Sequence, residues 1–389
     1  MRRIFLVSLA ILLLAALIFG GCAKPAPTPA PAPTPAPPSG EEWVPPIPGM
    51  KQGEEDKYFA WTWASADTRT KPPPGFDIPP REVFFSTLEE RTGGRFKVKY
   101  AYGGILGTAW EMTHLVGAGV AEMSRLSGPD PPSEYTYLTM PILGWYPPDY
   151  LTCQKLADNL YRHPLSQEIF DRMNLVYGGA YTHGTNYLLV RKGVKPIETA
   201  DDLLGLQLGQ WHVASRMWGE KVGMVPVTIF FYDSYEAMMK GMIDVIMVSL
   251  SGMRAFKIHE VIGQAIETSS AGSSLGFHYI NKDSWNSLPQ YIKDLWWEIY
   301  TTEFEDLYIR QQLASEQLGK DYCKEFGVKI FSLPEAEETK LVMATEPAWA
   351  SWADEVQQYP HGKQVREFLR DMIAAREKVT GKPWTVYTP

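Results

Sequence analysis

Two stretches of the chain alternate short apolar segments with segments of helical spacing, and this alternation constrains the fold more than any other feature. In the first stretch we expect strand, helix, strand and helix in turn, at 58–63, 80–92, 96–100 and 110–116. Strands that alternate with helices at this spacing are typical of parallel α/β sheets. The sequence therefore predicts an α/β protein.

The second stretch repeats this order in the middle of the chain. We expect strands at 187–190, 206–208, 225–230 and 243–248, and helices at 200–204, 213–222 and 233–241. Thr199 with Asp202, and Asp233 with Glu236, have the spacing of a capping box at a helix start. A second α/β unit is therefore expected here.

The last third of the chain is expected to be mainly helical. Between Pro289 and Phe326 the only helix breaker is Gly319, and apolar residues keep near-helical spacing throughout. One very long helix is therefore predicted, followed by a helical tail at 335–379. With 389 residues, of which 45% are hydrophobic, the chain is large enough for two lobes.

The amino terminus has the pattern of an export signal. Arg2 and Arg3 precede an apolar run at 4–19, which is shorter than the ~20 residues of a membrane-spanning helix. We expect residues 1–21 to be a signal peptide, with a retained membrane anchor as the alternative. The residues before Cys22 resemble a bacterial lipoprotein box, which implies a lipid anchor on that cysteine.

A proline-rich segment separates this signal from the folded part. Residues 24–48 contain eleven prolines, which forbid a helix and favour an extended polyproline II chain. We expect residues 22–56 to form the lipidated cysteine and its linker, and the folded part to begin at residue 57.

Composition excludes several classes of protein. The formal net charge is −8 and no run of Lys or Arg occurs, so nucleic-acid binding is not expected. Three cysteines are too few for a disulfide framework or a cysteine-rich zinc site, and Cys153 and Cys323 are expected to be two buried thiols. A mean hydropathy of −0.21 excludes a polytopic membrane protein.

Motifs for metal or catalytic chemistry are not found. His259-Glu260 lacks the second histidine of a zinc-protease motif, and His212 has no second histidine or carboxylate at metal spacing. No phosphate loop occurs. We therefore expect no catalytic residue, no metal and no cofactor, and an exported enzyme is the least favoured function.

Five segments resemble, in order and in spacing, the solute-binding proteins of tripartite ATP-independent periplasmic (TRAP) transporters. They are 90–95 (ERTGGR), 103–107 (GGILG) with Glu111, 196–206 (PIETADDLLGL), 235–244 (YEAMMKGMID) and 280–289 (INKDSWNSLP). The resemblance covers the chain from residue 58 to about residue 379.

This resemblance implies a two-lobed periplasmic-binding-protein fold, with a ligand cleft between the lobes and a long helix across both. We expect lobe I at 57–182 and 273–312, and lobe II at 183–272 and 313–389, which includes the carboxy-terminal helices. The resemblance also implies a receptor in the periplasm, or on the outer face of a bacterial membrane, that delivers a small organic ligand to TRAP permease subunits. A receptor for an ATP-driven permease or a sensor kinase is the alternative.

One departure from the family pattern bears on the ligand. The central strand of the family, G-L-K-I-R, ends in an arginine that pairs with the ligand carboxylate. In this chain the segment is 205–209, and Gly209 stands in place of that arginine. Glycine offers only backbone polar groups, so the usual carboxylate clamp is absent and simple dicarboxylates are expected to bind poorly.

Three alternatives follow for the ligand. In the first, a carboxylate is held by another arginine, either Arg125 after an expected strand at 119–123 or Arg216 on the next helix. In the second, a neutral or bulkier ligand stacks on aromatic rings and bonds to nearby polar groups. The candidates for these roles are Trp63, Trp211, Phe231, Asn186, Gln210 and His212, and Glu111 from the second matching segment completes the expected binding residues. In the third, ligand binding has been lost.

Overall fold

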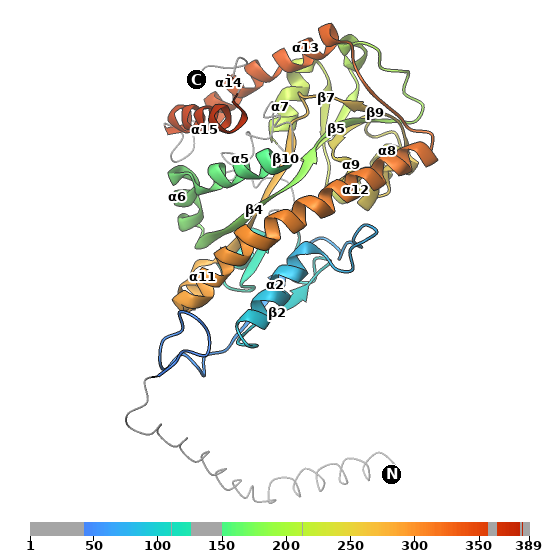
Figure 1. Ribbon diagram of the computed structural model, residues 1–389. Helices are drawn as coiled ribbons and strands as arrows, with labels where there is room; N and C mark the ends of the chain where they lie inside the picture. The colour runs from blue at the N-terminus through green and yellow to red at the C-terminus, as the bar shows by residue number, and fades with distance from the viewer. Residues whose placement is uncertain are drawn as a thin grey trace, which may run out of the picture. The chain divides into compact units, whose positions relative to one another are not determined.

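The computed structural model describes residues 43–109, 111–125, 150–211, 213–356, 364–381 and 383, which hold two β-sheets with helices packed around them (Figure 1). Residues 45–389 form one compact unit. The predicted signal peptide and Cys22 lie outside the described residues.

The folded part begins earlier than predicted. Ile47 and Met50 are buried, with 7% and 3% of their surface exposed. Gly49 lies against Tyr291, because a Cβ built on this glycine would sit 3.4 Å from the Cβ of that tyrosine. The linker predicted to reach residue 56 therefore ends sooner, since these apolar side chains gain more from packing than from solvent exposure.

Sheet A contains five strands in the order β2–β1–β3–β10–β4. They are β1 (Phe59–Ala64), β2 (Phe96–Ala101), β3 (Met123–Arg125), β4 (Leu175–Thr185) and β10 (Ser273–Asn281). β1 is parallel to β2 and β3, whereas β10 is antiparallel to β3 and β4. The carboxyl ends of β1 and β3 therefore meet at one edge of the sheet, the usual place for a ligand site in an open α/β sheet.

Sheet B contains six strands in the order β11–β9–β5–β8–β6–β7. They are β5 (Tyr187–Arg191), β6 (Gln207–Gln210), β7 (Val225–Thr228), β8 (Val245–Val248), β9 (Ile262–Glu267) and β11 (Lys329–Ser332). β6 is parallel to both β7 and β8, so the carboxyl ends of these three strands also lie together.

The chain crosses between the sheets three times, the third time through the long helix that separates β10 from β11. β4 ends at Thr185 and β5 begins at Tyr187, so the first crossing is the single residue Asn186, and the second crossing is 268–272. The Asn186 backbone N–H donates to the Gly272 carbonyl at 3.0 Å, and its side chain donates to the Ala271 carbonyl at 3.1 Å. The first two crossings are therefore bonded to each other.

The long helix predicted at 289–326 is confirmed. It runs as α11 (Gln290–Ile299), a π-helical segment η5 (Tyr300–Phe304) and α12 (Glu305–Glu325). α12 packs against α2 (Pro80–Arg91) and β4 of the sheet A side, and against α9 (Leu250–Ala255) and β11 of the sheet B side (Figure 1). The chain therefore has the expected architecture of two α/β lobes with one long helix across both.

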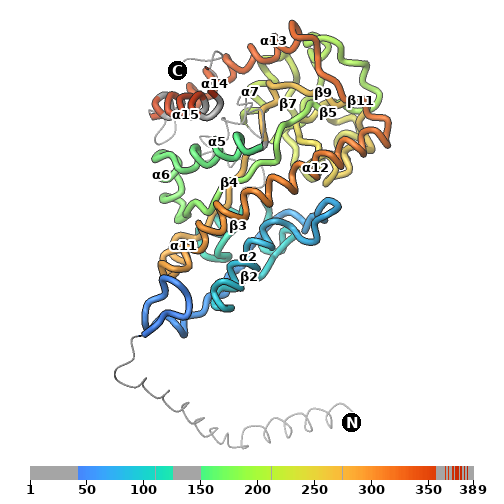
Figure 2. Tube along the Cα trace, in the orientation of Figure 1, coloured from blue at the N-terminus to red at the C-terminus, as the bar shows by residue number. Residues whose placement is uncertain are grey.

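The other described helices surround the two sheets. They are α3 (Met112–Gly117), α5 (Tyr150–Arg162), α6 (Pro164–Arg172), η2 (Ala200–Leu203), α7 (Val213–Val222), η3 (Phe231–Asp233), α8 (Ser234–Met239), η4 (Ile258–Glu260), α10 (Lys282–Ser287), α13 (Glu335–Met343), α14 (Thr345–Val356) and α15 (Val365–Thr380). α5 and α6 pack against β4, and α14 packs against α7 (Figure 2).

Two local predictions are corrected. The strand expected at 119–123 begins only at Met123, because Gly119 is in a left-handed turn with φ of 76°. The capping box expected at Asp233 does not form, since Asp233 ends the turn η3 with helical backbone angles, and Glu236 instead pairs with Lys240 at 2.7 Å. The Thr199–Asp202 cap does form, with 2.9 Å between the Thr199 nitrogen and the carboxylate.

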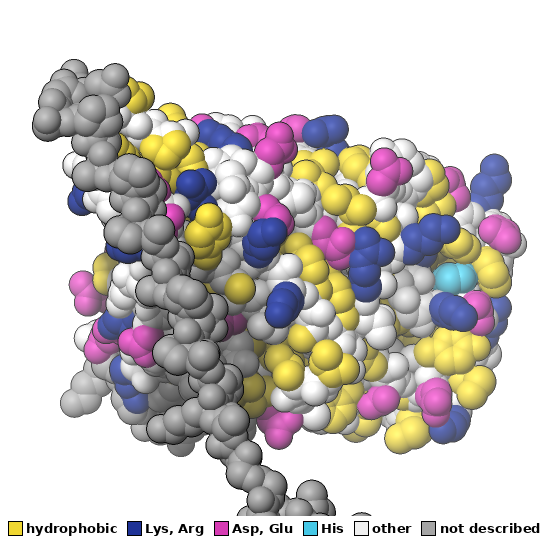
Figure 3. All heavy atoms as spheres, turned by 90° about the horizontal axis from the view of Figure 1, so that it is seen from below, with side chains coloured by type: hydrophobic (Ala, Val, Ile, Leu, Met, Phe, Trp, Pro, Cys, Tyr) yellow, Lys and Arg dark blue, Asp and Glu magenta, His cyan; other side chains and the backbone are white. Residues whose placement is uncertain are grey.

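Within the described part of the chain, no helix is long and apolar enough to cross a membrane. No three His, Cys, Asp or Glu side chains of that part are grouped as a metal site would need. Cys153 and Cys323 are free, buried thiols, as predicted. On the face drawn in Figure 3, acidic and basic side chains are intermixed with apolar ones.

Candidate ligand-binding site

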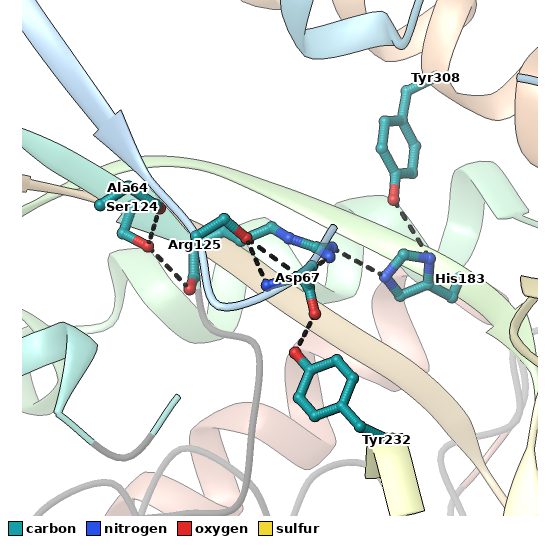
Figure 4. Close-up of polar contacts among 8 residues, drawn as sticks. Ala64, Asp67, Ser124, Arg125, His183, Tyr232 and Tyr308 are labelled. Carbon is teal, nitrogen blue, oxygen red and sulfur yellow. Dashed lines mark hydrogen bonds and ion pairs between the residues drawn. The ribbon is translucent and has the colours of Figure 1, made fainter. Parts of the chain in front are cut away.

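A cluster of polar side chains lies where the carboxyl ends of β1 and β3 face the sheet B side of the molecule (Figure 4). Its members come from five separate segments, namely Asp67 after β1, Arg125 at the end of β3, His183 in β4, Tyr232 in η3 and Tyr308 in α12. We call these five residues the cleft cluster.

The centre of the cleft cluster is a buried ion pair between Asp67 and Arg125. Arg125 donates from Nη2 to Oδ2 of Asp67, and the two side chains are only 12% and 10% exposed. Ser65 adds a hydroxyl donor to the same oxygen at 3.3 Å. Burial alone would raise the pKa of Asp67, but the Arg125 guanidinium and the Tyr232 hydroxyl hold it below its usual range, so Asp67 stays ionised.

Tyr232 connects the two sides of the cleft. Its hydroxyl, carried by η3 beside sheet B, donates to Oδ1 of Asp67, which follows β1 of sheet A (Figure 4). Burial, together with the nearby Asp67 carboxylate, raises the pKa of Tyr232, so its hydroxyl keeps the proton that it donates. Asp67 is therefore contacted from both lobes at once.

His183 is uncharged. Burial, reinforced by the Arg125 guanidinium, lowers its pKa to about 3. Arg125 Nη1 lies 3.5 Å from His183 Nε2, and the Tyr308 hydroxyl lies 3.4 Å from Nδ1. Because arginine can only donate, Nε2 is the acceptor and the single ring proton belongs on Nδ1, facing Tyr308.

Aromatic rings form a wall beside the ion pair. Tyr181 lies 5.3 Å from His183, 5.1 Å from His278 and 5.7 Å from Tyr308 between ring centroids, and the Arg125 guanidinium carbon lies 5.7 Å from the Tyr181 ring centroid. His278 stands opposite Arg125 in the β3–β10 register. The neighbouring Gly276 is required here, since a Cβ at this position would lie 2.3 Å from the Tyr181 ring.

A second arginine lies next to this wall. The Arg81 guanidinium carbon is 4.8 Å from the centroid of the Trp63 ring, and Trp63 is 5.3 Å from His278. A small cavity of about 10 Å³ lies between α2 and η5 and has Arg81, His278 and Phe304 in its lining. Among the described residues, Nε1 of Trp63 and Nε of Arg81 have no hydrogen-bond acceptor.

Among the described residues around the ion pair, the charges leave one positive charge in excess. Arg81 and Arg125 are both positive and Asp67 is negative. Burial lowers the pKa of His278 well below its usual value, so this ring is neutral like His183. Glu82, beside Arg81, is paired with Arg69 at 2.7 Å. A single negative charge on a ligand would therefore balance the site.

The predicted residues Trp211 and Phe231 lie together on the sheet B side. Their ring centroids are 4.7 Å apart, and Phe231 lies 4.2 Å from Phe256, which is also 5.6 Å from Tyr232. The two predicted rings thus adjoin the cleft cluster through Phe256, although both also pack on the apolar core of sheet B.

The other predicted polar residues have local partners. Gln210 is buried and donates to the Thr228 hydroxyl at 2.7 Å, and Asn186 bonds across the first two crossings. Glu111 is exposed and accepts from the Thr108 backbone and hydroxyl at 2.9 and 2.8 Å, so it stabilises the turn before α3. His212 lies outside the described residues. None of these side chains joins the cleft cluster in the part that the structure describes.

Comparison with known proteins decides the family. Residues 81–355 match the family model for bacterial extracellular solute-binding protein, family 7 (DctP). This chain belongs to that family. Its members are solute-binding receptors, and the family is an extracytoplasmic one.

Solved structures of TRAP solute-binding proteins share the fold of this family 7 protein. One from a marine metagenome, described as specific for aromatic acids and holding metahydroxyphenylacetate, is 18% identical with a TM-score of 0.70, covering 82% of this chain and 99% of its own. One from Rhodoferax ferrireducens with benzoate is 17% identical with a TM-score of 0.71, covering 83% and 98%. One from Bordetella bronchiseptica with mandelate is 16% identical with a TM-score of 0.68, covering 83% and 99%.

In this family 7 protein, a side chain at the position of the missing arginine would displace its neighbours. A Cβ on Gly209 would lie 2.5 Å from Cδ1 of Ile243 and 3.0 Å from Cδ1 of Ile229. Gly209 is paired with Val227 on one side and Ile246 on the other, so its surroundings are apolar in every direction. The glycine is therefore part of the packing of sheet B.

Of the two arginines considered as replacements, Arg125 lies in the cleft cluster and Arg216 does not. Arg216 is on α7 and pairs with Glu220 and with Glu355 of α14, each at 3.0 Å. Its guanidinium thus joins two helices. A ligand carboxylate would have to compete with these two glutamates for it.

Sequence reasoning missed four members of the cleft cluster and Arg81. Asp67 lies in a loop rich in proline and glycine, and His183 and Tyr308 are in segments without a local motif. Two weak signals were present, because Arg81 follows Pro79-Pro80 at a helix start and Tyr232 is adjacent to the predicted Phe231. The contacts themselves join residues 58 to 165 positions apart, which no local pattern reveals.

Proposed function

We propose that this chain is the solute receptor of a TRAP transporter and binds an aromatic monocarboxylate in the cleft, with Arg125 as the main partner of the ligand carboxylate. The observation that carries this proposal is the position of Arg125, which is buried at the lobe-facing end of β3 and surrounded by aromatic rings. An arginine in such surroundings can bind a carboxylate strongly, because little water competes.

The charge of the site supports a monoanion. Arg81 and Arg125 exceed Asp67 by one positive charge, and both neighbouring histidines are neutral. One carboxylate would balance this excess, whereas two would leave a buried negative charge. The donors Nε1 of Trp63 and Nε of Arg81, which have no acceptor among the described residues, also favour a ligand that brings acceptor oxygens.

The rings of the site support an aromatic or similarly flat ligand body. Tyr181, Tyr308 and Trp63 are all buried, with 2%, 5% and 0% of their surface exposed. Aromatic rings prefer offset or edge-on contacts with other rings, worth about 0.5–1.5 kcal/mol each. Benzoate, mandelate and metahydroxyphenylacetate occupy structures that share this fold, which is consistent with the proposal.

We propose that the protein is located at the outer face of a bacterial membrane, with Cys22 as its lipid anchor. TRAP permease subunits are the proposed partner that receives the ligand. The apolar run and the cysteine at its end support the anchor. Changing Cys22→Ser should release the protein from membranes, which fractionation and blotting would show. If the variant stays with the membrane as the wild type does, another element anchors the chain.

Ligand binding is best tested with two arginine variants of the same chain. Native mass spectrometry of the purified protein should reveal a copurified monocarboxylate, and calorimetry should give its affinity. Arg125→Ala is expected to weaken binding by about ten- to a hundredfold, the value of a charged hydrogen bond. Arg216→Ala is the matched control and should bind like the wild type. Equal affinity in both variants would remove Arg125 from the site.

A further inference from the structure

The cleft contains a carboxylate of its own. Asp67 is fixed at the meeting point of both lobes, and its two oxygens have different neighbours. Oδ2 accepts from Arg125 and from Ser65. Oδ1 accepts from Tyr232, which reaches it from the opposite lobe (Figure 4). Oδ1 therefore points toward the space between the lobes.

We infer that Asp67 selects the ligand: the carboxylate ligand also presents a hydroxyl or a protonated amine to Oδ1 of Asp67, and a second carboxylate on the ligand is rejected. This inference rests on the proposed function, since it assumes an aromatic monocarboxylate beside Arg125. The ligand thus has a second functional group besides its carboxylate, and Asp67 is the residue that binds this group.

The hydrogen-bond count of Asp67 leaves one acceptor position. A carboxylate oxygen accepts about two hydrogen bonds. Oδ2 has two donors, Arg125 and Ser65, whereas Oδ1 has the single donor Tyr232 among the described residues. A ligand donor to this oxygen would form a further hydrogen bond to a charged group, so a ligand that supplies one gains affinity.

The charge of Asp67 accounts for the rejection of a second carboxylate. Asp67 stays ionised because Arg125 and Tyr232 hold its pKa below the usual range. Two carboxylates in one buried site repel each other strongly, and among the described residues the positive charges of Arg81 and Arg125 are already balanced by Asp67 and the first ligand carboxylate. A protonated amine is attracted by the same charge, so hydroxyl and amine are both favoured.

The experiment uses four benzoates that differ only at the 3-position, namely benzoate, 3-hydroxybenzoate, 3-(aminomethyl)benzoate and benzene-1,3-dicarboxylate. Their dissociation constants are measured by calorimetry for the full chain and for Asp67→Asn. The wild type should bind the hydroxyl and amine compounds about tenfold or more tightly than benzoate, and the dicarboxylate about tenfold or more weakly. In Asp67→Asn, the hydroxyl compound and the dicarboxylate should come within about threefold of benzoate, and the amine should lose its advantage.

Ratios between ligands are the readout, because Asp67→Asn also frees Arg125 and so changes the affinity for every carboxylate. Tyr232→Phe is the matched control. It removes a donor from Oδ1 but keeps the charge of Asp67, so it should still reject the dicarboxylate. Thermal unfolding of each variant shows that it is folded before titration.

Each outcome decides between the two proposals. If the benzoates bind the wild type but their ratios are the same in Asp67→Asn, Asp67 only positions Arg125, and the inference is wrong while the proposed function stands. If Tyr232→Phe accepts the dicarboxylate as readily as Asp67→Asn does, lobe closure rather than charge selects the ligand, and the inference is again wrong. If none of the four binds the wild type, the proposed function itself fails.

Discussion

Two strand ends on opposite sides of the cleft differ in what they carry. At the end of β3, Arg125 is buried and its charge is balanced by Asp67. Near the end of β6, Gly209 has no side chain, and Ile243 and Ile229 fill the space where one would begin. In the family pattern the arginine lies at the end of the strand that corresponds to β6. In this chain the buried arginine lies at the end of β3.

The difference shows that the position of a binding charge depends on its counter-ion and on free volume. An arginine removed from water without a partner costs several kcal/mol. Beside β3 this cost is offset, since Asp67 and the Tyr181 ring both contact the guanidinium. Beside β6 the neighbours are aliphatic, so an arginine would have neither partner nor space.

The largest effect on stability is expected at the end of β3, where Asp67 balances the charge of Arg125. Arg125→Ala leaves Asp67 buried without its counter-ion, which typically costs about 3–5 kcal/mol of folding free energy. Chemical denaturation should show this loss together with the loss of ligand binding. The double variant Asp67→Asn/Arg125→Met removes both charges and should recover most of the stability but none of the binding. If it stays as unstable as Arg125→Ala, the loss is not electrostatic.

The apolar packing around Gly209 on β6 is tested by adding a single methyl group. Gly209→Ala places a Cβ 2.5 Å from Cδ1 of Ile243, so the core must shift at a cost of about 1–3 kcal/mol. The double variant Gly209→Ala/Ile243→Val removes that Cδ1 atom and should be more stable than Gly209→Ala alone. Chemical denaturation measures both. A Gly209→Ala protein as stable as the wild type would show that the space exists, and the comparison of the two strand ends would fail.

Acidification tests the buried charges around Arg125, at the end of β3, through the pH dependence of stability. The pKa of His183 is lowered to about 3 from 6.5, so below pH 6.5 the unfolded chain takes up a proton that the folded protein excludes. Stability should therefore fall as the pH falls from 6.5 towards about 5, by up to about 1.4 kcal/mol per pH unit for this histidine. His278, whose pKa is lowered by burial, adds to the same slope.

Thermal or chemical unfolding across this pH range measures the slope. His183→Gln should flatten it, whereas His114→Gln, at an exposed position on α3, should leave it unchanged. An identical slope in His183→Gln and the wild type would mean that His183 accepts a proton in the folded protein.

The smallest effect is expected at Arg216. Its ion pairs with Glu220 and Glu355 are partly exposed, and such pairs contribute about 0–1 kcal/mol. Arg216→Ala should therefore lower stability only slightly, with no change in ligand affinity. A large loss of affinity in this variant would return the carboxylate to lobe II and reverse the assignment of the two strand ends.

The sequence predicts the elements whose periodicity is strong. The helix at 213–222 and the long helix after Pro289 are found where they were expected. β4 and β10 were not predicted, because glycine, serine and threonine interrupt their apolar pattern at Gly178, Gly184 and Gly276. Glycine in a strand normally weakens the signal, but here Gly184 and Gly276 make room for the rings of Tyr150 and Tyr181.

The site is less predictable than the fold. Arg125 could be named because it follows an expected strand. Its partner Asp67 is 58 residues away, and Tyr232 is 165 residues from Asp67, so only the folded chain brings them together. Gly209 could be identified as a departure, but its cause, the side chains of Ile243 and Ile229, is a fact of three-dimensional packing.

The bonds of Asn186 to the second crossing limit how the lobes can move. Asn186 holds Gly272 through its backbone and Ala271 through its side chain, so the first two connections are pinned at one level. Two strands tied at one point can bend there, but they cannot slide past each other without breaking these bonds. A swing of the lobes about Asn186 would keep these bonds, but α12, the third connection, would also have to bend or slide on one lobe. In such a swing, residues far from Asn186 travel furthest, and those beside it hardly move.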